Sequence, residues 1–171
     1  MRKSILILVL SLVLLLTLGI NVQAQNKEVS ETCTTTWYAP SKMLPLGEGI
    51  VALTYEGIGT TVSDTGRGLF HNATTRFLGS LKVEKGVYKD ERGWGVYNLQ
   101  NGDKVFVTYT AAGEVKPGGL GFGKGTGTII GGTGKAAGIQ GSVEYTRTMV
   151  RSALEGIGQS YSKKTIKYTL P

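Results

Sequence analysis

The chain has 171 residues, a formal net charge of +7, 26 glycines and a single cysteine. One cysteine excludes an intramolecular disulfide, and the length is that of a single ordinary domain. Its basic residues are scattered and do not form a stripe interleaved with aromatic side chains. Nucleic acid is therefore not an expected partner.

The N-terminus predicts export. Arg2 and Lys3 precede a predominantly apolar, uncharged run over residues 5–20, and Ala24 supplies the small residue expected at a cleavage point. These are the features of a secretory signal peptide. The run of roughly 16 residues is short for a hydrocarbon core of about 30 Å, although an uncleaved anchor remains the alternative. We therefore expect a signal peptide over residues 1–24, a periplasmic or extracellular protein, and no stable membrane insertion after cleavage.

Residues 25–171 are expected to form one domain. Removing Arg2 and Lys3 with the leader lowers the net charge from +7 to +5. Apolar and polar residues alternate with a period of two in segment after segment, which is typical of half-buried strands. The pattern predicts an all-β, eight-stranded antiparallel barrel with strands near residues 32–38, 49–57, 74–85, 93–99, 104–111, 125–131, 139–150 and 160–170.

Two connections carry specific predictions. Asn101-Gly102 stands between apolar runs and predicts a two-residue hairpin. The charged segment over residues 90–94 predicts a second hairpin at a mouth of the barrel, which makes Arg92 and Trp94 candidates for its rim. Glu56 has the opposite parity from the neighbouring tyrosine and is expected as a solvated rim carboxylate at a strand end.

The alternation also predicts which face points inward. One face carries the apolar residues, and the opposite face carries mostly lysine, glutamate and threonine. Five tyrosines share the apolar face and are candidate lumen or ligand-binding residues: Tyr55, Tyr97, Tyr109, Tyr145 and Tyr168. An eight-stranded barrel is just wide enough to be filled by side chains or to hold one small ligand. The tyrosines therefore either plug the lumen or line a pocket.

The sequence contains no motif that predicts a metal or cofactor site. His71 is the single histidine, Cys33 has no partner spacing typical of a zinc site, and we predict no metal site. The glycine-rich stretch before Gly125 resembles a phosphate-binding loop, but Gly125 stands where a serine or threonine must reach magnesium. No helical pattern follows it, so no cofactor is predicted.

The glycine run over residues 125–141 predicts a strand, a tight corner and a second strand. Within it, the Gly-Gly-Thr-Gly-Lys corner at 131–135 and the Gly-x-x-Gly that ends at Gly141 resemble the corner of allene oxide cyclase-like and dirigent-like barrels. Exported bacterial relatives of that superfamily, many without an assigned function, are similar in strand spacing. The resemblance implies an eight-stranded antiparallel barrel that is often a homo-oligomer, with a lumen that holds a hydrophobic substrate in some members.

The sequence favours an exported barrel that binds a small hydrophobic ligand in its lumen, or one that serves as a non-catalytic structural or interaction module. An isomerase or cyclase acting on a hydrophobic substrate is the alternative, and it requires a hydrogen-bonded carboxylate or an arginine that points into the cavity. No catalytic residue is assigned, because fold alone does not supply one. A small outer-membrane barrel is a further alternative, disfavoured by the lack of aromatic girdles.

Overall fold

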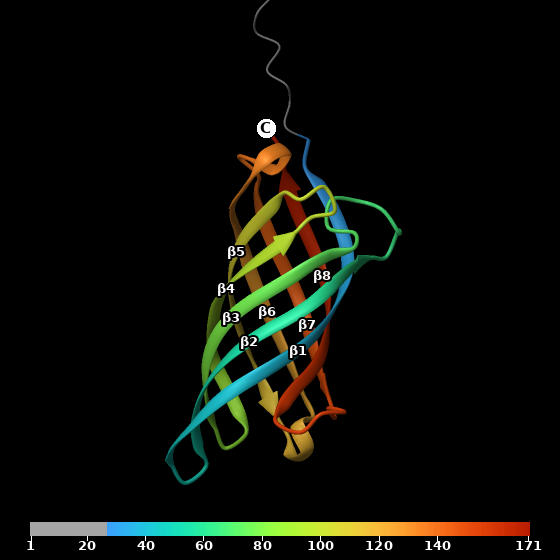
Figure 1. Ribbon diagram of the computed structural model, residues 1–171. Coiled ribbons are helices and arrows are strands. Elements are labelled where there is room, and N and C mark those ends of the chain that lie inside the picture. Colours follow the sequence, from blue (N-terminus) through green and yellow to red (C-terminus); the bar gives the residue numbers. More distant parts are fainter. Residues whose placement is uncertain (1–26) are drawn as a thin grey trace, which may run out of the picture.

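The computed structural model describes residues 27–171, which form a closed antiparallel barrel (Figure 1). Each strand pairs with its neighbours in the chain, and β8 closes the barrel by pairing with β1. The predicted fold class is confirmed, whereas the predicted signal peptide over residues 1–24 lies outside the described residues. The strands are β1 (Val29–Gly47), β2 (Ile50–Ser63), β3 (Ala73–Glu84), β4 (Val87–Asn98), β5 (Lys104–Val115), β6 (Gly121–Gly132), β7 (Gln140–Val150) and β8 (Ile157–Thr169).

The two short helices lie in connections. A 3-10 helix η1 (Pro117–Gly119) joins β5 to β6, and a second, η2 (Gly134–Ala136), forms the predicted glycine corner between β6 and β7. The Asp103 carboxylate accepts a hydrogen bond from the Lys135 backbone N–H at 2.9 Å, which ties this corner to the β4–β5 connection. In the part of the chain that the structure describes, no helix is long and apolar enough to cross a membrane.

Two predicted turns are wrong. Residues 90–94 lie within β4, because the β3–β4 turn is formed by Lys85 and Gly86, both with positive φ. The β4–β5 connection is also longer than two residues: the Leu99 N–H donates to the Asp103 carbonyl at 2.8 Å, and of these residues only Gly102 has a positive φ.

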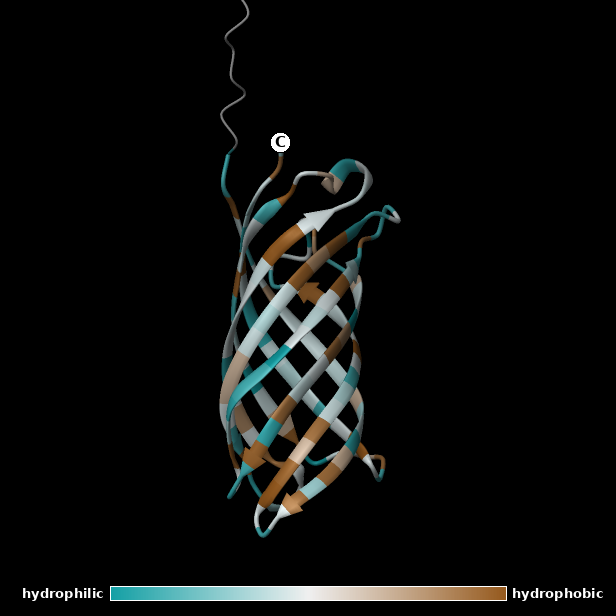
Figure 2. Cartoon of the chain, turned by 90° about the vertical axis from the view of Figure 1, so that its left-hand side faces the viewer, coloured by the Kyte–Doolittle hydropathy of each residue, from teal (hydrophilic) through white to brown (hydrophobic). Residues whose placement is uncertain are grey.

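Hydropathy alternates along the strands, as Figure 2 shows, and the apolar set faces inward. The core consists mainly of aromatic and branched side chains from most of the strands. Lysines and glutamates of the opposite parity, such as Lys82, Glu144 and Lys167, are exposed on the outer wall. The predicted orientation of the two faces is therefore confirmed by the pattern of burial.

Glycines on the inner face leave space for the tyrosine rings. A Cβ atom at Gly79 would overlap the hydroxyl ends of Tyr55 and Tyr109, and a Cβ at Gly125 would overlap Tyr145. At Gly93 it would overlap both Tyr109 and the Leu78 carbonyl oxygen, which belongs to the neighbouring backbone and cannot swing away. Each of these tyrosine rings thus packs over a glycine, where a larger side chain would leave no space for the ring.

This complementarity predicts a cost for adding one methyl group. We expect Gly93→Ala to lower the free energy of unfolding by about 1–3 kcal/mol, the range for overpacked cores. Gly47→Ala is the control, because a Cβ there meets nothing within 4 Å, and it should stay within about 0.5 kcal/mol of the parent. Urea unfolding of the two variants checks both values. Equal stabilities would show that the inner glycines are not required for packing.

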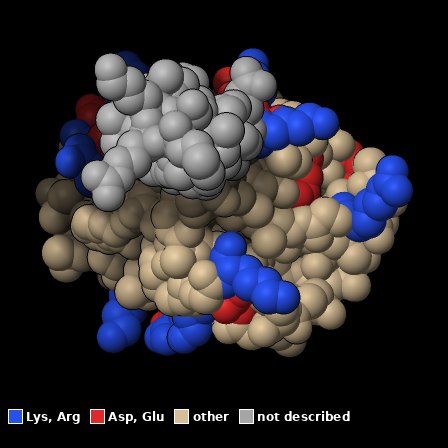
Figure 3. Space-filling view, turned by 90° about the horizontal axis from the view of Figure 1, so that it is seen from above, with Lys and Arg blue, Asp and Glu red and all other residues tan. Residues whose placement is uncertain are grey.

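The end of the barrel at which β1 begins and β8 ends is closed by the β2–β3 loop. The buried Glu31 carboxylate accepts hydrogen bonds from the Leu69 N–H at 2.7 Å and from the Tyr168 hydroxyl at 2.6 Å. The loop thereby places Phe70 edge-on to Tyr97 inside the lumen. A view onto this end shows mostly uncharged atoms, with lysine and arginine side chains that project separately (Figure 3).

Candidate functional site in the barrel lumen

The lumen contains a cavity of about 60 Å³. Its apolar wall is formed by Trp37, Phe77, Val107 and Val143, which come from four different strands. An engineered apolar cavity of about 150 Å³ holds a benzene ring, so this space suits a smaller molecule or the end of a longer chain. The sequence left a plugged lumen and an open pocket as alternatives; side chains fill most of the lumen, and a small cavity remains.

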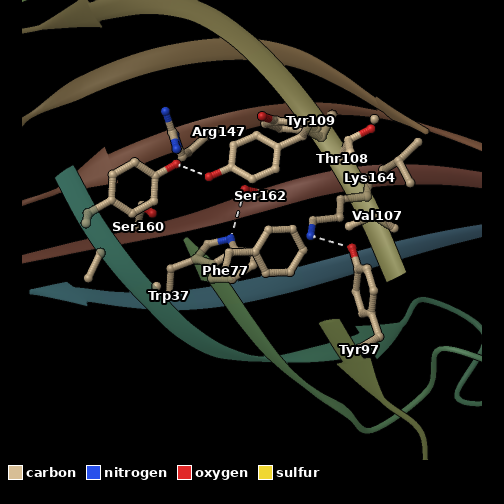
Figure 4. Close-up of a pocket in the computed structure, with 16 residues that line it drawn as sticks. Trp37, Phe77, Tyr97, Val107, Thr108, Tyr109, Arg147, Ser160, Ser162 and Lys164 are labelled. Atoms are coloured by element: carbon tan, nitrogen blue, oxygen red, sulfur yellow. Dashed lines mark hydrogen bonds between the residues drawn. The ribbon is translucent and has the colours of Figure 1, made fainter. Parts of the chain in front are cut away.

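Two aromatic residues fix one side of this cavity. Trp37 and Phe77 pack edge-to-face with ring centroids 4.9 Å apart. The Trp37 indole N–H donates to the Ser162 hydroxyl at 3.1 Å, which satisfies the indole's polar group (Figure 4). Both rings are therefore held in place by specific contacts on this side of the cavity.

A cluster of tyrosines forms a second side. The hydroxyls of Tyr55 and Tyr109 lie 2.5 Å apart, and Tyr55 also donates to the Glu91 carboxylate. Burial raises the pKa of Tyr109 to about 12 and raises the pKa of Tyr145 still further, so both phenols stay neutral near pH 7. Because Tyr55 donates its only proton to Glu91, Tyr109 donates to the Tyr55 oxygen, and Tyr145 is the phenol that can donate a hydrogen bond to a ligand.

Beneath these tyrosines lies a buried ion pair. The Glu91 side chain is fully buried, and both of its carboxylate oxygens accept hydrogen bonds from Arg147. The Arg147 guanidinium donates a further bond to the Tyr88 hydroxyl at 2.9 Å. Burial by itself lowers the pKa of Arg147, but the charge of Glu91, the hydrogen bonds to it and the nearby Tyr88 and Tyr55 together outweigh burial and hold that pKa well above its ordinary value.

Arg147 also presents an unused donor. Its Nε–H is buried without a hydrogen-bond partner within residues 27–171, and Arg147 lines the cavity, whereas Glu91 does not. Buried donors are rarely left unpaired in folded proteins. An acceptor atom of a ligand, or of water, would complete the site.

Lys164 supplies the second inward cation. Its amine donates to the Tyr97 hydroxyl at 3.0 Å and lies 4.6 Å from the centre of the Trp37 ring (Figure 4). Burial lowers the pKa of Lys164 from 10.5 to about 7. The aromatic faces favour the charged amine by only about 0.5–2 kcal/mol, whereas removing an ammonium group from water costs several kcal/mol. Burial therefore dominates.

Cys33 is paired across the β1–β8 ladder with Lys164 and is fully buried. Burial, with a smaller contribution from the Glu31 charge, raises the pKa of the Cys33 thiol to about 12. The thiol is therefore protonated at neutral pH and a poor nucleophile.

All five candidate tyrosines lie on the inner face. Four of them line the cavity: Tyr55, Tyr97, Tyr109 and Tyr145. Tyr168 lies apart from it, where it binds Glu31 at the closed end. Tyr88, which is not among the predicted lumen residues, is also buried in the lumen.

The three rim candidates lie together, but on the outer wall. Glu56 is in the interior of β2 and forms an ion pair with Arg76 at 2.6 Å, while Arg92 and Trp94 follow one another on the exposed side of β4. With Leu78, they line a shallow outer groove. Their predicted location at a mouth is therefore wrong, because the pleat directs their side chains away from the lumen.

Arg147, Lys164 and Glu91 are the residues that sequence reasoning missed. Arg147 follows Tyr145 by two positions and Lys164 precedes Ile166 by two, so the parity rule could have placed both inside. Glu91 was hidden by a β-bulge, where the β4–β5 register shifts between Tyr88 and Glu91. Both of these residues face inward although they are three positions apart, which breaks the alternation.

No family model matches the chain, and no curated protein is similar to it in sequence. The functional conclusion therefore depends on the geometry of the lumen.

Proposed function

We propose that this protein is an exported barrel that binds a small, mainly apolar ligand in its lumen, with one hydrogen-bond acceptor directed toward Arg147. The observation that carries the proposal is an apolar cavity lined by Arg147, whose buried Nε–H has no hydrogen-bond partner within residues 27–171. Ligand sites typically combine an apolar lining with a few polar groups that fix orientation. Export rests on the leader sequence, and the barrel resemblance to allene oxide cyclase-like proteins agrees with a lumenal ligand.

An isomerase or cyclase is the second candidate. It is favoured by Arg147 and by the neutral hydroxyls of Tyr109 and Tyr145, all of which line the cavity. The Glu91 carboxylate, however, is committed to Arg147 and Tyr55 and does not line the cavity. A general base must reach the proton that it removes, so ligand binding is the better-supported function.

The outer wall is relevant to two further hypotheses, the outer-membrane barrel and the homo-oligomer. Exposed charges on it, including Glu144, Lys163 and Lys167, disfavour contact with lipid and hence an outer-membrane barrel. Exposed apolar residues on β2, β3 and β4, among them Ile58, Leu78 and Trp94, agree with the expected homo-oligomer.

Binding of n-propanol tests the proposal, because its four heavy atoms match the cavity. We expect a dissociation constant in the millimolar range, since even the best small ligands gain at most about 1.5 kcal/mol per heavy atom. The readout is the indole N–H resonance in NMR spectra. Trp37 lines the cavity and should shift, while Trp94, which is 65% exposed on the outer wall, serves as an internal control.

A matched pair of variants locates the binding. Val143→Phe adds a ring inside the cavity and should abolish the shift of the Trp37 resonance, whereas Val62→Phe adds the same ring at an exposed position of β2 and should preserve it. Parallel shifts of Trp37 and Trp94, or no shift of either in the parent, would contradict lumenal binding.

A further inference from the structure

The surroundings of Lys164 are those of a reactive amine and differ from those of a lysine in a structural ion pair. Its side chain is buried, and Lys164 lines a cavity that can admit a small molecule. Among residues 27–171, the ion pairs of the structure do not include Lys164, so no carboxylate holds its charge. Buried lysines without a counter-charge are the usual source of amine nucleophiles in proteins.

We propose that Lys164 forms a Schiff base with a small aldehyde or ketone bound in the cavity, a proposal that rests on the proposed ligand-binding function. The ligand class is thereby narrowed to carbonyl compounds with a short apolar chain. Trp37 and Phe77 would pack against that chain, since the Lys164 amine lies 4.6 and 5.3 Å from their ring centres.

The chemistry balances without any further reagent. The lone pair of the neutral Nζ attacks the carbonyl carbon, and the C=O π electrons move to the oxygen. Transfer of one Nζ proton to that oxygen gives a carbinolamine. The new hydroxyl group then leaves together with the second Nζ proton as one water molecule, and the C=N bond remains. Tyr97, at 3.0 Å from Nζ, is positioned to accept the first proton while its own hydroxyl proton passes to the oxygen.

The groups around the amine keep it available. Burial lowers the pKa of Lys164 to about 7, so about half of the amine is neutral at pH 7. Burial also raises the pKa of Tyr97, which therefore stays a neutral phenol, and raises that of Cys33 to about 12. Arg147, the charged group on β7, has no proton to lose in this range. An exposed lysine has on the order of a thousandfold less neutral amine at the same pH.

Reductive trapping with propanal tests the proposal in the full-length mature protein. Propanal and sodium cyanoborohydride are added at pH 7, and peptide mapping by mass spectrometry locates each added propyl group. We expect Lys164 to be labelled at least about tenfold faster than any exposed lysine, such as Lys163. Lys164→Met removes that site and should leave the remaining labelling unchanged.

Competition between n-propanol and propanal tests the same proposal in the parent protein, so the result does not depend on whether a variant folds. Saturating n-propanol should slow the labelling of Lys164 in the parent protein and leave Lys163 unaffected. If n-propanol shifts the Trp37 resonance but Lys164 is not labelled preferentially, the Schiff base is refuted and the ligand site stands. If n-propanol neither shifts Trp37 nor protects Lys164, both proposals fail.

Discussion

Glu91→Gln is expected to lower the free energy of unfolding by about 3–5 kcal/mol, because it removes the counter-charge of a buried arginine. The substitution keeps the size of the side chain, so no cavity is made. Arg147 cannot lose its proton, and its guanidinium would remain in the lumen with only neutral partners. The loss is measured by urea unfolding at pH 7.

Two comparisons separate this effect from a general loss of charge. Glu144→Gln removes an exposed carboxylate on β7 and should change stability by no more than about 0.5 kcal/mol. The double variant Glu91→Gln/Arg147→Met removes both charges and should lose less than the two single variants together, with a coupling of about 0.5–3 kcal/mol. A Glu91→Gln protein as stable as Glu144→Gln would contradict the account of the lumen.

Lys164→Met is expected to stabilise the fold at pH 6, and the gain is expected to shrink as the pH rises. In the parent, the pKa of Lys164 is lowered to about 7 in the fold, against 10.5 in the unfolded chain. Between these values the unfolded state binds more protons, so the stability of the parent rises with pH, while methionine does not titrate. The charged amine costs on the order of 4–5 kcal/mol below pH 7, offset by about 1–3 kcal/mol for the lost partner of Tyr97.

The diagnostic quantity is the slope and not the absolute gain. The difference in stability between Lys164→Met and the parent should fall by about 3 kcal/mol between pH 7 and 9.5. In the fold, Cys33, Tyr97 and Arg147 keep their protonation over this range. The Cys33 thiol does ionise in the unfolded chain, but it does so in both proteins, so its contribution cancels in the difference. Measurements stop below pH 10, where tyrosines ionise in the unfolded chain.

Lys163→Met is the control for the pH series, because Lys163 is the exposed neighbour on β8. Its stability difference from the parent should stay flat from pH 6 to 9.5. A flat profile for Lys164→Met as well would mean that this amine is fully solvated, and the inference of a reactive lysine would then lose its physical basis.

The barrel fold could be predicted from the sequence, because the alternation of apolar and polar residues and the positions of turn glycines are visible within short segments. The corner around Gly134 and the inward parity of Phe77 or Tyr109 need no information from distant strands. The inner glycines are harder to interpret. Gly93 is required by Tyr109 of the neighbouring strand, and that relation exists only once the β4–β5 register is set.

The site was less predictable, because its polar members break local rules. Glu91 stands in a charged run that resembles a turn, and it becomes a lumenal residue only through the bulge that follows Tyr88. Its partner Arg147 is 56 positions away in the chain, so no spacing motif joins them. The parity of Arg147 and Lys164 was available in the sequence, but a buried charge is expected only when its partner or its environment is known.

The most direct test of lumenal binding is a crystal structure of residues 25–171 soaked with n-propanol. We expect density for one propanol between Trp37, Val107 and Val143, with its hydroxyl directed toward Arg147. A cavity that holds only water at saturating n-propanol, with the alcohol bound on the outer wall or absent, would contradict it.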